Sequence, residues 1–471
     1  MTLEYIGILS LLVGVISLFS KPSFIVYFFF CSTLLGSAAA FVLDSLGGTN
    51  ISPSHLLLGF LTFKLFHDER VARGIAREVS VGRPGFWLLL TVVYSIIGAF
   101  YLPRLLAGQT MTYAVRAQGA FVIPLAPAMS NLTQSIYFTA DFVCFIVLSG
   151  YASTTDGRKV LGGAALACAT LNLVFAALDL MTYFTNTTEL FSFIRNANYA
   201  LLNDTEVAGL KRIVGSFTEA SSFGAATLCY FAFTSRLWLL GIQPRVTLTL
   251  ALLSLAALVF STSSTAYVGL SVILALSYLQ ALLKALRRPV TTQMGSFILA
   301  TPFILLMIVL VIALNDDYFA YVKNYLDGTI FNKLSTASGV ERSAMNSQAW
   351  QNFIDTFGFG VGNGSVRASS FLIAVLASLG ITGALMFCLF FVTLFARRAR
   401  HQSDAVDDAY RQAARMACIA WLVTATTSGA LIDLGLAFYV FAAFASAQPA
   451  SILSNSRNLE VDRFLGDPAE A

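Results

Sequence analysis

The sequence has few charged residues. Asp, Glu, Lys and Arg make up 11% of the 471 residues, whereas 57% are hydrophobic. A soluble globular protein carries roughly a quarter of charged residues, because water must solvate its surface. The composition therefore excludes a water-soluble protein of this length and predicts an integral membrane protein.

Residues that bind metals are also scarce or scattered. The three histidines, His55, His67 and His401, lie far apart, and the six cysteines all fall inside apolar segments. Neither residue type shows the short spacing of a metal site, and the cysteines show no disulfide framework. We therefore expect no metal and no cofactor.

Apolar segments of membrane-crossing length recur along the whole chain. A span needs about 20 apolar residues, and a backbone in hydrocarbon must satisfy its own hydrogen bonds, which favours helices. Thirteen spans are predicted, at residues 4–20, 23–45, 51–66, 86–103, 131–151, 161–184, 218–235, 246–261, 265–283, 296–314, 369–396, 412–430 and 434–452. The expected fold class is an all-α integral membrane bundle of about 12–13 helices, forming one polytopic domain over residues 1–471.

The Lys and Arg residues predict the orientation of this bundle. Most of them fall in connections on one side, among them residues 64–83 and 397–415. Loops rich in Lys and Arg stay in the cytoplasm, so this side is expected to be cytoplasmic, together with a tail at 453–471. Three long connections, 104–130, 185–217 and 315–368, are then extracytoplasmic, and long loops in compact proteins are often functional.

The longest of these loops, 315–368, contains an amphipathic helix. Apolar residues recur there at helical spacing, and polar residues occupy the opposite face. The apolar set is Met345, Ala349, Trp350, Phe353, Ile354 and Phe357, and the polar set is Asn346, Gln348, Asn352 and Asp355. Such a helix can lie flat in the membrane interface or cap the bundle as ordinary core, and the spacing leaves both alternatives open.

A glycine-rich stretch, Gly358 to Arg367, follows this helix. Glycine at every second position lets a backbone turn tightly and present N–H groups to an anion. One interpretation is a re-entrant turn that leads into the next span. The other is an anion cradle, in which Gly362, Gly364 and Ser365 provide the backbone groups and Arg367 adds a charge.

Basic residues of the predicted outer loops form a candidate anion site. The set is Arg195, Lys211, Arg212, Arg342 and Arg367. Glu219 follows Arg212 at the mouth of a predicted span, where a carboxylate is costly and often functional. Since the planar arginine side chain binds phosphate through paired hydrogen bonds, the set predicts anion binding rather than metal-dependent hydrolysis.

The order of several short motifs resembles the O-antigen ligase and polymerase superfamily, and within it the polymerases of exopolysaccharide and capsule. The motifs are the stretch 212–223 with its Gly-x-Phe-x-Glu pattern, the Ser/Thr run 261–265, Glu341-Arg342-Ser343 with Trp350, the glycine-rich run 360–365 and the run 379–383. The resemblance covers roughly residues 200–395 and rests on the ordered set of motifs.

This resemblance implies a GT-C-like glycosyltransferase on the outer face of a bacterial inner membrane. Such enzymes transfer an oligosaccharide from undecaprenyl pyrophosphate to an acceptor sugar hydroxyl without a metal ion. At the matching positions, Arg212 and Arg342 would bind the pyrophosphate and stabilise its departure, and Glu219 would orient or deprotonate the acceptor. Expected partners are the lipid-linked oligosaccharide, membrane lipids, a chain-length regulator and export machinery; no nucleic acid is expected.

Two alternatives remain open. Ligases of this superfamily typically carry a His shortly after the glycine-rich stretch, where this chain has residues 366–370 without one, so a polymerase is favoured over a ligase. The rival from another class is a lipid-linked sugar flippase or a proton-coupled transporter. Asp141 and Asp179 lie within predicted spans, and intramembrane carboxylates often mark ion pathways, although they can equally be hydrogen-bonded to neighbouring helices.

Overall fold

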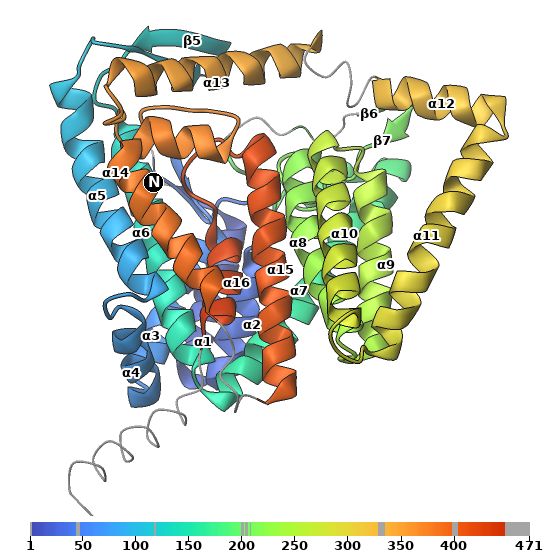
Figure 1. Ribbon diagram of the computed structural model, residues 1–471. Helices are drawn as coiled ribbons and strands as arrows, with labels where there is room; N and C mark the ends of the chain where they lie inside the picture. Colours follow the sequence, from blue (N-terminus) through green and yellow to red (C-terminus); the bar gives the residue numbers. More distant parts are fainter. Residues whose placement is uncertain are drawn as a thin grey trace, which may run out of the picture.

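The computed structural model describes residues 2–43, 48–116, 119–198, 202, 206–207, 209–327, 335–397 and 404–447. This part of the chain is mostly helical, with sixteen α-helices. The long helices run side by side between two ends of a bundle (Figure 1). Each predicted span corresponds to one helix, although the boundaries differ.

The helices that correspond to predicted spans are α1 (Tyr5–Phe19), α2 (Pro22–Ser32), α3 (Pro53–Phe66), α5 (Pro84–Leu105), α6 (Met129–Ala152), α7 (Thr155–Phe184), α8 (Ala220–Leu239), α9 (Pro244–Phe260), α10 (Ser264–Ala285), α11 (Thr292–Ala313), α14 (Phe371–Ala396), α15 (Ala405–Ser428) and α16 (Leu436–Ser446). The others are α4 (Glu69–Glu78), α12 (Asp316–Leu326) and α13 (Ala337–Asp355). We call the end that carries α12 and α13 the loop end (Figure 1); α4 lies at the opposite end.

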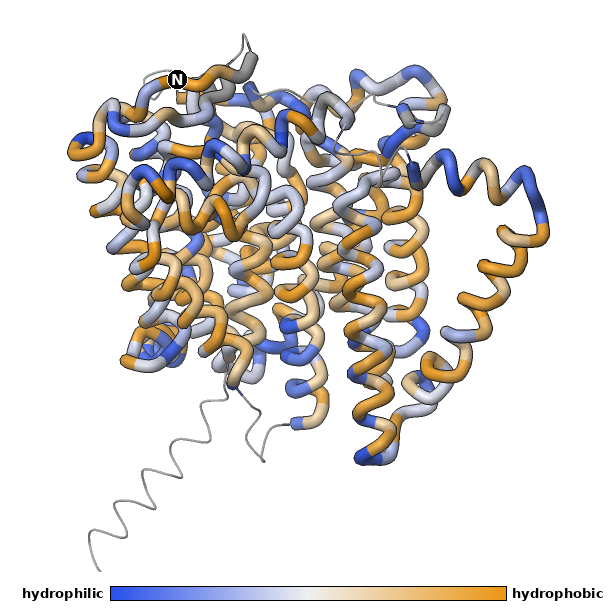
Figure 2. The backbone as a smooth tube through the Cα atoms, turned by 45° about the horizontal axis from the view of Figure 1, so that its top comes forward, coloured by the Kyte–Doolittle hydropathy of each residue, from blue (hydrophilic) through white to orange (hydrophobic). Residues whose placement is uncertain are grey.

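The protein is a membrane protein. Six helices, α5, α6, α7, α10, α11 and α14, are long and apolar enough to cross a bilayer. Hydrophobic residues run along the helices, and hydrophilic residues gather at the two ends of the bundle (Figure 2). Helix α11 leans away from its neighbours (Figure 1), and Leu299 and Phe303 on it are 68% and 67% exposed. Such a surface is stable in hydrocarbon, where apolar side chains need no cover.

Short strands, which the sequence analysis does not predict, add to the loop end. The antiparallel pairs are β1 (Thr2–Leu3), β2 (Phe41–Leu43) and β3 (Thr49–Ile51) in one sheet, β4 (Met111–Arg116) with β5 (Gly119–Pro124), and β6 (Glu206–Val207) with β7 (Leu210–Lys211). Helix α2 ends at Ser32, and turns over residues 33–40 lead to β2, so the predicted span 23–45 is too long. Strands of two to six residues carry little periodic signal in a sequence.

Helix α13 lies across the loop end (Figure 1), and Asn352 of its polar set is fully buried there. The Asn352 side chain donates to Thr110 Oγ1 at 2.9 Å, and Gln348 donates to the Met111 carbonyl at 2.6 Å. Trp350 and Ile354 are 46% and 51% exposed on the other side. Trp350 and Ile354 can therefore contact the membrane interface, whereas Ala349 of the same apolar set is buried against the bundle.

A buried ion pair joins three helices at the opposite end. The Arg397 guanidinium, just after α14, donates to the Glu78 carboxylate of α4 at 3.0 Å and to Ser446 Oγ of α16 at 2.6 Å. Ser446 Oγ also donates to Glu78 at 2.7 Å. The Arg397 and Glu78 side chains are only 11% and 8% exposed, so each charge depends on the other.

Glu78→Ala is expected to lower the free energy of unfolding by about 3–5 kcal/mol, because Arg397 would remain buried without its counter-charge. Thermal unfolding in detergent measures the loss. The matched control is Arg70→Ala, which removes an exposed pair with Asp68 (66% and 36% exposed) and should leave the unfolding midpoint near that of the wild type, because solvent screens an exposed pair. Equal midpoints for the two variants would contradict a structural role for the buried pair.

Candidate functional site

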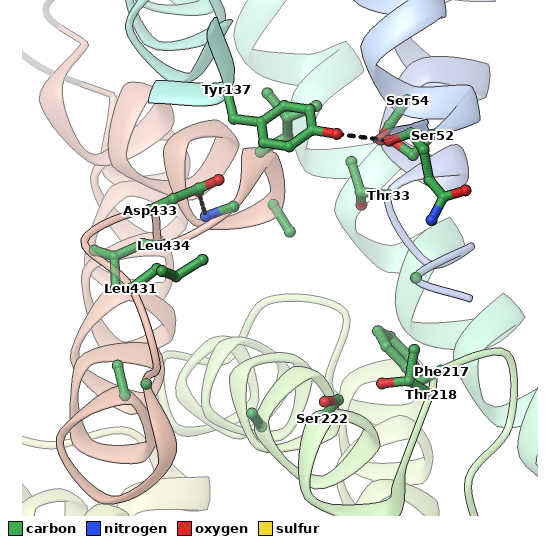
Figure 3. Close-up of a pocket in the computed structure, with 18 of the residues that line it drawn as sticks. Thr33, Ser52, Ser54, Tyr137, Phe217, Thr218, Ser222, Leu431, Asp433 and Leu434 are labelled. Atoms are coloured by element: carbon green, nitrogen blue, oxygen red, sulfur yellow. Dashed lines mark hydrogen bonds between the residues drawn. The ribbon is translucent and has the colours of Figure 1, made fainter. Parts of the chain in front are cut away.

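A cavity of about 740 Å³ lies at the loop end of the bundle. Its walls come from segments that are far apart in the sequence: the turn after α2, the start of α3, part of α6, the start of α8, Arg367, and the connection between α15 and α16. Figure 3 shows Tyr137 and Asp433 on one side of the cavity and Thr218 and Ser222 on the other. Tertiary structure alone brings these segments together.

The cavity lining is rich in hydroxyl and amide side chains. Examples from different walls are Thr33, Asn50, Thr133, Gln134, Thr218 and Ser222. Hydroxyl groups and amides both donate and accept hydrogen bonds, so the lining matches a ligand that carries many hydroxyl groups. The aromatic residues Tyr137 and Trp421 also line it and offer flat apolar faces between the polar groups.

Three helices begin at this cavity. Ser52, Glu219 and Gly435 are the N-cap residues of α3, α8 and α16, and all three line it. Among the described residues, no side chain caps the first N–H groups of α8 or α16, whereas Ser52 Oγ accepts from the His55 N–H at the start of α3. A helix N-terminus carries a partial positive charge and unpaired N–H donors, which together favour anions. The exposed side chain of Arg367 adds a full positive charge to the same lining.

Three titratable side chains face this positive region: Glu219, Asp433 and His55. Ser221 Oγ donates to the Glu219 carboxylate, and Asp433 Oδ1 accepts from the Gly435 N–H at 2.5 Å. His55 Nδ1 is 2.7 Å from Ser52 Oγ. The cavity therefore combines an anion-favouring region with groups that can accept or donate a proton.

Two of the predicted site residues, Glu219 and Arg367, meet in the cavity. Lys211, in β7, is buried with its ammonium 5.1 Å from the centre of the Tyr183 ring, and Arg212 follows it. Arg342 lies in the first part of α13, half-buried. These three cations are at the loop end but not in the cavity lining, so the structure divides the predicted set into two groups.

Arg195 is part of a buried clasp. Its guanidinium donates to Asp179 Oδ1 at 2.6 Å, and Asp179 Oδ2 accepts from the N–H groups of Val214 and Gly215 at 2.8 and 3.1 Å. The Arg195 and Asp179 side chains are 5% and 1% exposed. The geometry assigns both residues a structural role that fixes the loop before α8. We therefore take Arg195 out of the candidate binding site.

The glycine-rich stretch packs against backbone instead of forming an open cradle. A Cβ on Gly362 would lie 2.6 Å from the Gly98 carbonyl oxygen, and one on Gly364 would lie 2.3 Å from that of Ser130. The Gly362 N–H donates to the Ser378 carbonyl at 3.0 Å, and that of Ser365 donates to Gly362. The N–H groups of Gly362 and Ser365 are occupied and Gly364 packs closely against Ser130, which favours the re-entrant turn over an open cradle. We therefore take Gly362, Gly364 and Ser365 out of the candidate site.

Sequence reasoning missed His55, Tyr137 and Asp433. No motif surrounds them, and His55 lies near the start of the predicted span 51–66. The available signal was weak: His55 and Asp433 are ionisable residues at the edges of apolar segments, where such residues are often functional. Comparisons with protein-family models, with curated proteins and with solved structures find no match to this chain. The fold and site therefore define only a helical membrane protein with a polar cavity at one end.

The structural role of the Arg195–Asp179 ion pair can be tested by measuring the stability of variants. Arg195→Met is expected to lower the free energy of unfolding by about 3–5 kcal/mol, because Asp179 would stay buried without its cation. The matched variant Arg342→Ala removes a cation that forms no ion pair with another described residue, and its unfolding midpoint in detergent should stay near that of the wild type. A normal midpoint for Arg195→Met would show that Asp179 does not need this partner.

Proposed function

We propose that this protein is a GT-C-like membrane glycosyltransferase that polymerises lipid-linked oligosaccharide repeats into a surface polysaccharide. In this proposal the membrane is a bacterial inner membrane, and the loop end, with residues 185–217 and 315–368, faces outward. The proposal also fits the positive-inside distribution of Lys and Arg. The observation that carries it is the meeting of three helix N-termini and Arg367 in a cavity lined by hydroxyl and amide groups.

Each part of the cavity matches one part of the proposed substrate. The helix N-termini and Arg367 suit a pyrophosphate, which is anionic and accepts several hydrogen bonds. The hydroxyl and amide side chains suit the hydroxyl groups of a sugar. Arg212 and Arg342, at the loop end outside the lining, would attract the anionic donor and guide it toward the cavity.

The proposed transfer needs no external co-reactant. The acceptor hydroxyl oxygen forms a bond to the anomeric carbon of the donor, and the bond between that carbon and the pyrophosphate oxygen breaks. The leaving pyrophosphate keeps the bonding electron pair, and Arg367 and the helix N-termini stabilise its charge. Glu219 accepts the hydroxyl proton, since its carboxylate lines the same cavity.

A transporter or flippase is the second candidate, because Asp141 of α6 is buried. It is 1% exposed, and its carboxylate interacts with that of Asp433 on the cavity wall. Two neighbouring carboxylates inside a membrane can share a proton or hold a cation. The ligase alternative differs from the polymerase only in its acceptor. It would transfer the oligosaccharide to a lipid A-type acceptor in place of a growing chain.

The test is polymer formation by purified protein in liposomes with undecaprenyl-pyrophosphate-linked oligosaccharide. Wild type should give a ladder of longer lipid-linked glycans, resolved by gel or mass spectrometry. Arg367→Ala should lower kcat by about 10²–10³-fold through the loss of leaving-group stabilisation. Glu219→Gln should lower it by about 10²–10⁴-fold, because the amide cannot accept the proton.

The matched control for Arg367 is Arg104→Ala. Arg104 is exposed at the end of α5, with its guanidinium over the Phe100 ring at 4.1 Å, and it does not line the cavity, so its variant should polymerise normally. If wild type makes no polymer but moves the lipid-linked sugar across the membrane, and Asp141→Asn stops that movement, the transporter replaces the enzyme.

A further inference from the structure

An apolar groove of about 590 Å³ lies between α3 and α6, beside the polar cavity. The α3 residues that line it fall on one helical face: His55, Leu58, Gly59, Thr62, Phe63, Phe66 and His67. Ile136, Thr139, Ala140 and Val143 of α6 form the other wall. At 1.5 Å per residue, the distance from His55 to His67 is about 18 Å along α3, a large part of the roughly 30 Å of hydrocarbon in a bilayer.

Gly59 keeps this groove open. A Cβ on Gly59 would meet no atom within 4 Å, so no close approach of another backbone requires a glycine there. A glycine inside a helix is less stable than alanine by about 1 kcal/mol. Gly14 of α1 is different, because a Cβ there would lie 2.4 Å from the Phe60 ring. Gly14 serves helix packing, whereas Gly59 leaves an empty space on the other side of α3.

The groove and the polar cavity share one lining residue, His55. The His55 ring is fixed by Ser52 Oγ at 2.7 Å and lies 4.9 Å from the Tyr137 ring, centre to centre. The end of the groove at His55 therefore lies next to the cavity that holds the helix N-termini and Arg367. The remainder follows the length of α3 with apolar walls.

We propose that this groove binds the hydrocarbon chain of the lipid whose pyrophosphate head enters the cavity. The proposal rests on the proposed function, which supplies a lipid-linked substrate. A lipid cannot place its head in the cavity unless its chain leaves through an apolar path, because exposing the chain to polar groups or water is costly. The occupant is an isoprenoid chain, and an ordinary phospholipid is the competing outcome.

Gly59→Leu tests the groove without disturbing the fold. Leucine fits the open space and favours a helix more than glycine does, so the unfolding midpoint should not fall. Undecaprenyl pyrophosphate itself is the probe, and its binding to purified protein in detergent is measured by native mass spectrometry. Each buried CH₂ group changes affinity about fourfold, so we expect binding to weaken by about tenfold or more when leucine displaces part of the chain.

The matched control is Gly295→Leu. Gly295 of α11 also has no atom within 4 Å of an added Cβ, but it lies outside the groove and the cavity, so this variant should bind undecaprenyl pyrophosphate as the wild type does. A second arm compares two donors with the same oligosaccharide, one on undecaprenyl pyrophosphate and one on a short water-soluble prenyl pyrophosphate. Gly59→Leu should raise the ratio of their KM values (long chain over short chain) about tenfold.

The outcomes separate this inference from the proposed function. Normal binding of undecaprenyl pyrophosphate by Gly59→Leu overturns the proposal that the groove binds the isoprenoid chain, even if the wild type makes polymer. Retention of a phosphatidyl lipid that the probe cannot displace from wild type overturns it as well. If wild type makes no polymer from either donor, the proposed function fails, and probe binding lost in Gly59→Leu but kept in Gly295→Leu would still establish the groove.

Discussion

A backbone inside an apolar bundle must satisfy its own N–H and C=O groups, and this constraint governs where the chain departs from helix. The break in α14 is the clearest case. Gly380 has φ 63° and ψ −168°, so the carbonyls of the preceding turn lose their helical donors. The glycine-rich stretch replaces them: the N–H groups of Val361 and Gly362 donate to the Ala377 and Ser378 carbonyls at 2.8 and 3.0 Å.

These hydrogen bonds between the glycine-rich stretch and α14 also determine the position of Arg367. The stretch can lie against α5, α6 and the broken α14 because glycine lets the backbones approach closely. A third hydrogen bond runs in the opposite direction, from the Ile381 N–H of α14 to the Gly358 carbonyl at 2.9 Å. The chain then leaves this packed segment at Arg367, whose exposed side chain lines the cavity. The glycine-rich stretch, which satisfies backbone hydrogen bonds of α14, thus also places the charge of Arg367 in the candidate site.

The charges of the bundle fall into two classes. Arg195 with Asp179 and Arg397 with Glu78 are buried pairs that connect separate segments, and a buried charge without its partner is strongly destabilising. Arg367 and Glu219, by contrast, line a cavity that a ligand can enter. Both classes contain an arginine and a carboxylate. Burial and ion-pair partners therefore distinguish the two classes, not the residue type.

The sequence by itself determined the membrane class, the approximate positions of the helices and the concentration of cations in the loops, because hydrophobic length and charge are local properties. It also identified Glu219 and Arg367 as candidates. It could not separate Arg195 from Arg367, since the ion pair of Arg195 with Asp179 forms between α7 and the loop that follows it. Nor could it find His55, Asp433 or the role of Gly59. Only the packing of α3, α6, α8 and the segment before α16 decided which side chains share a cavity, because those contacts join residues that lie tens to hundreds of positions apart.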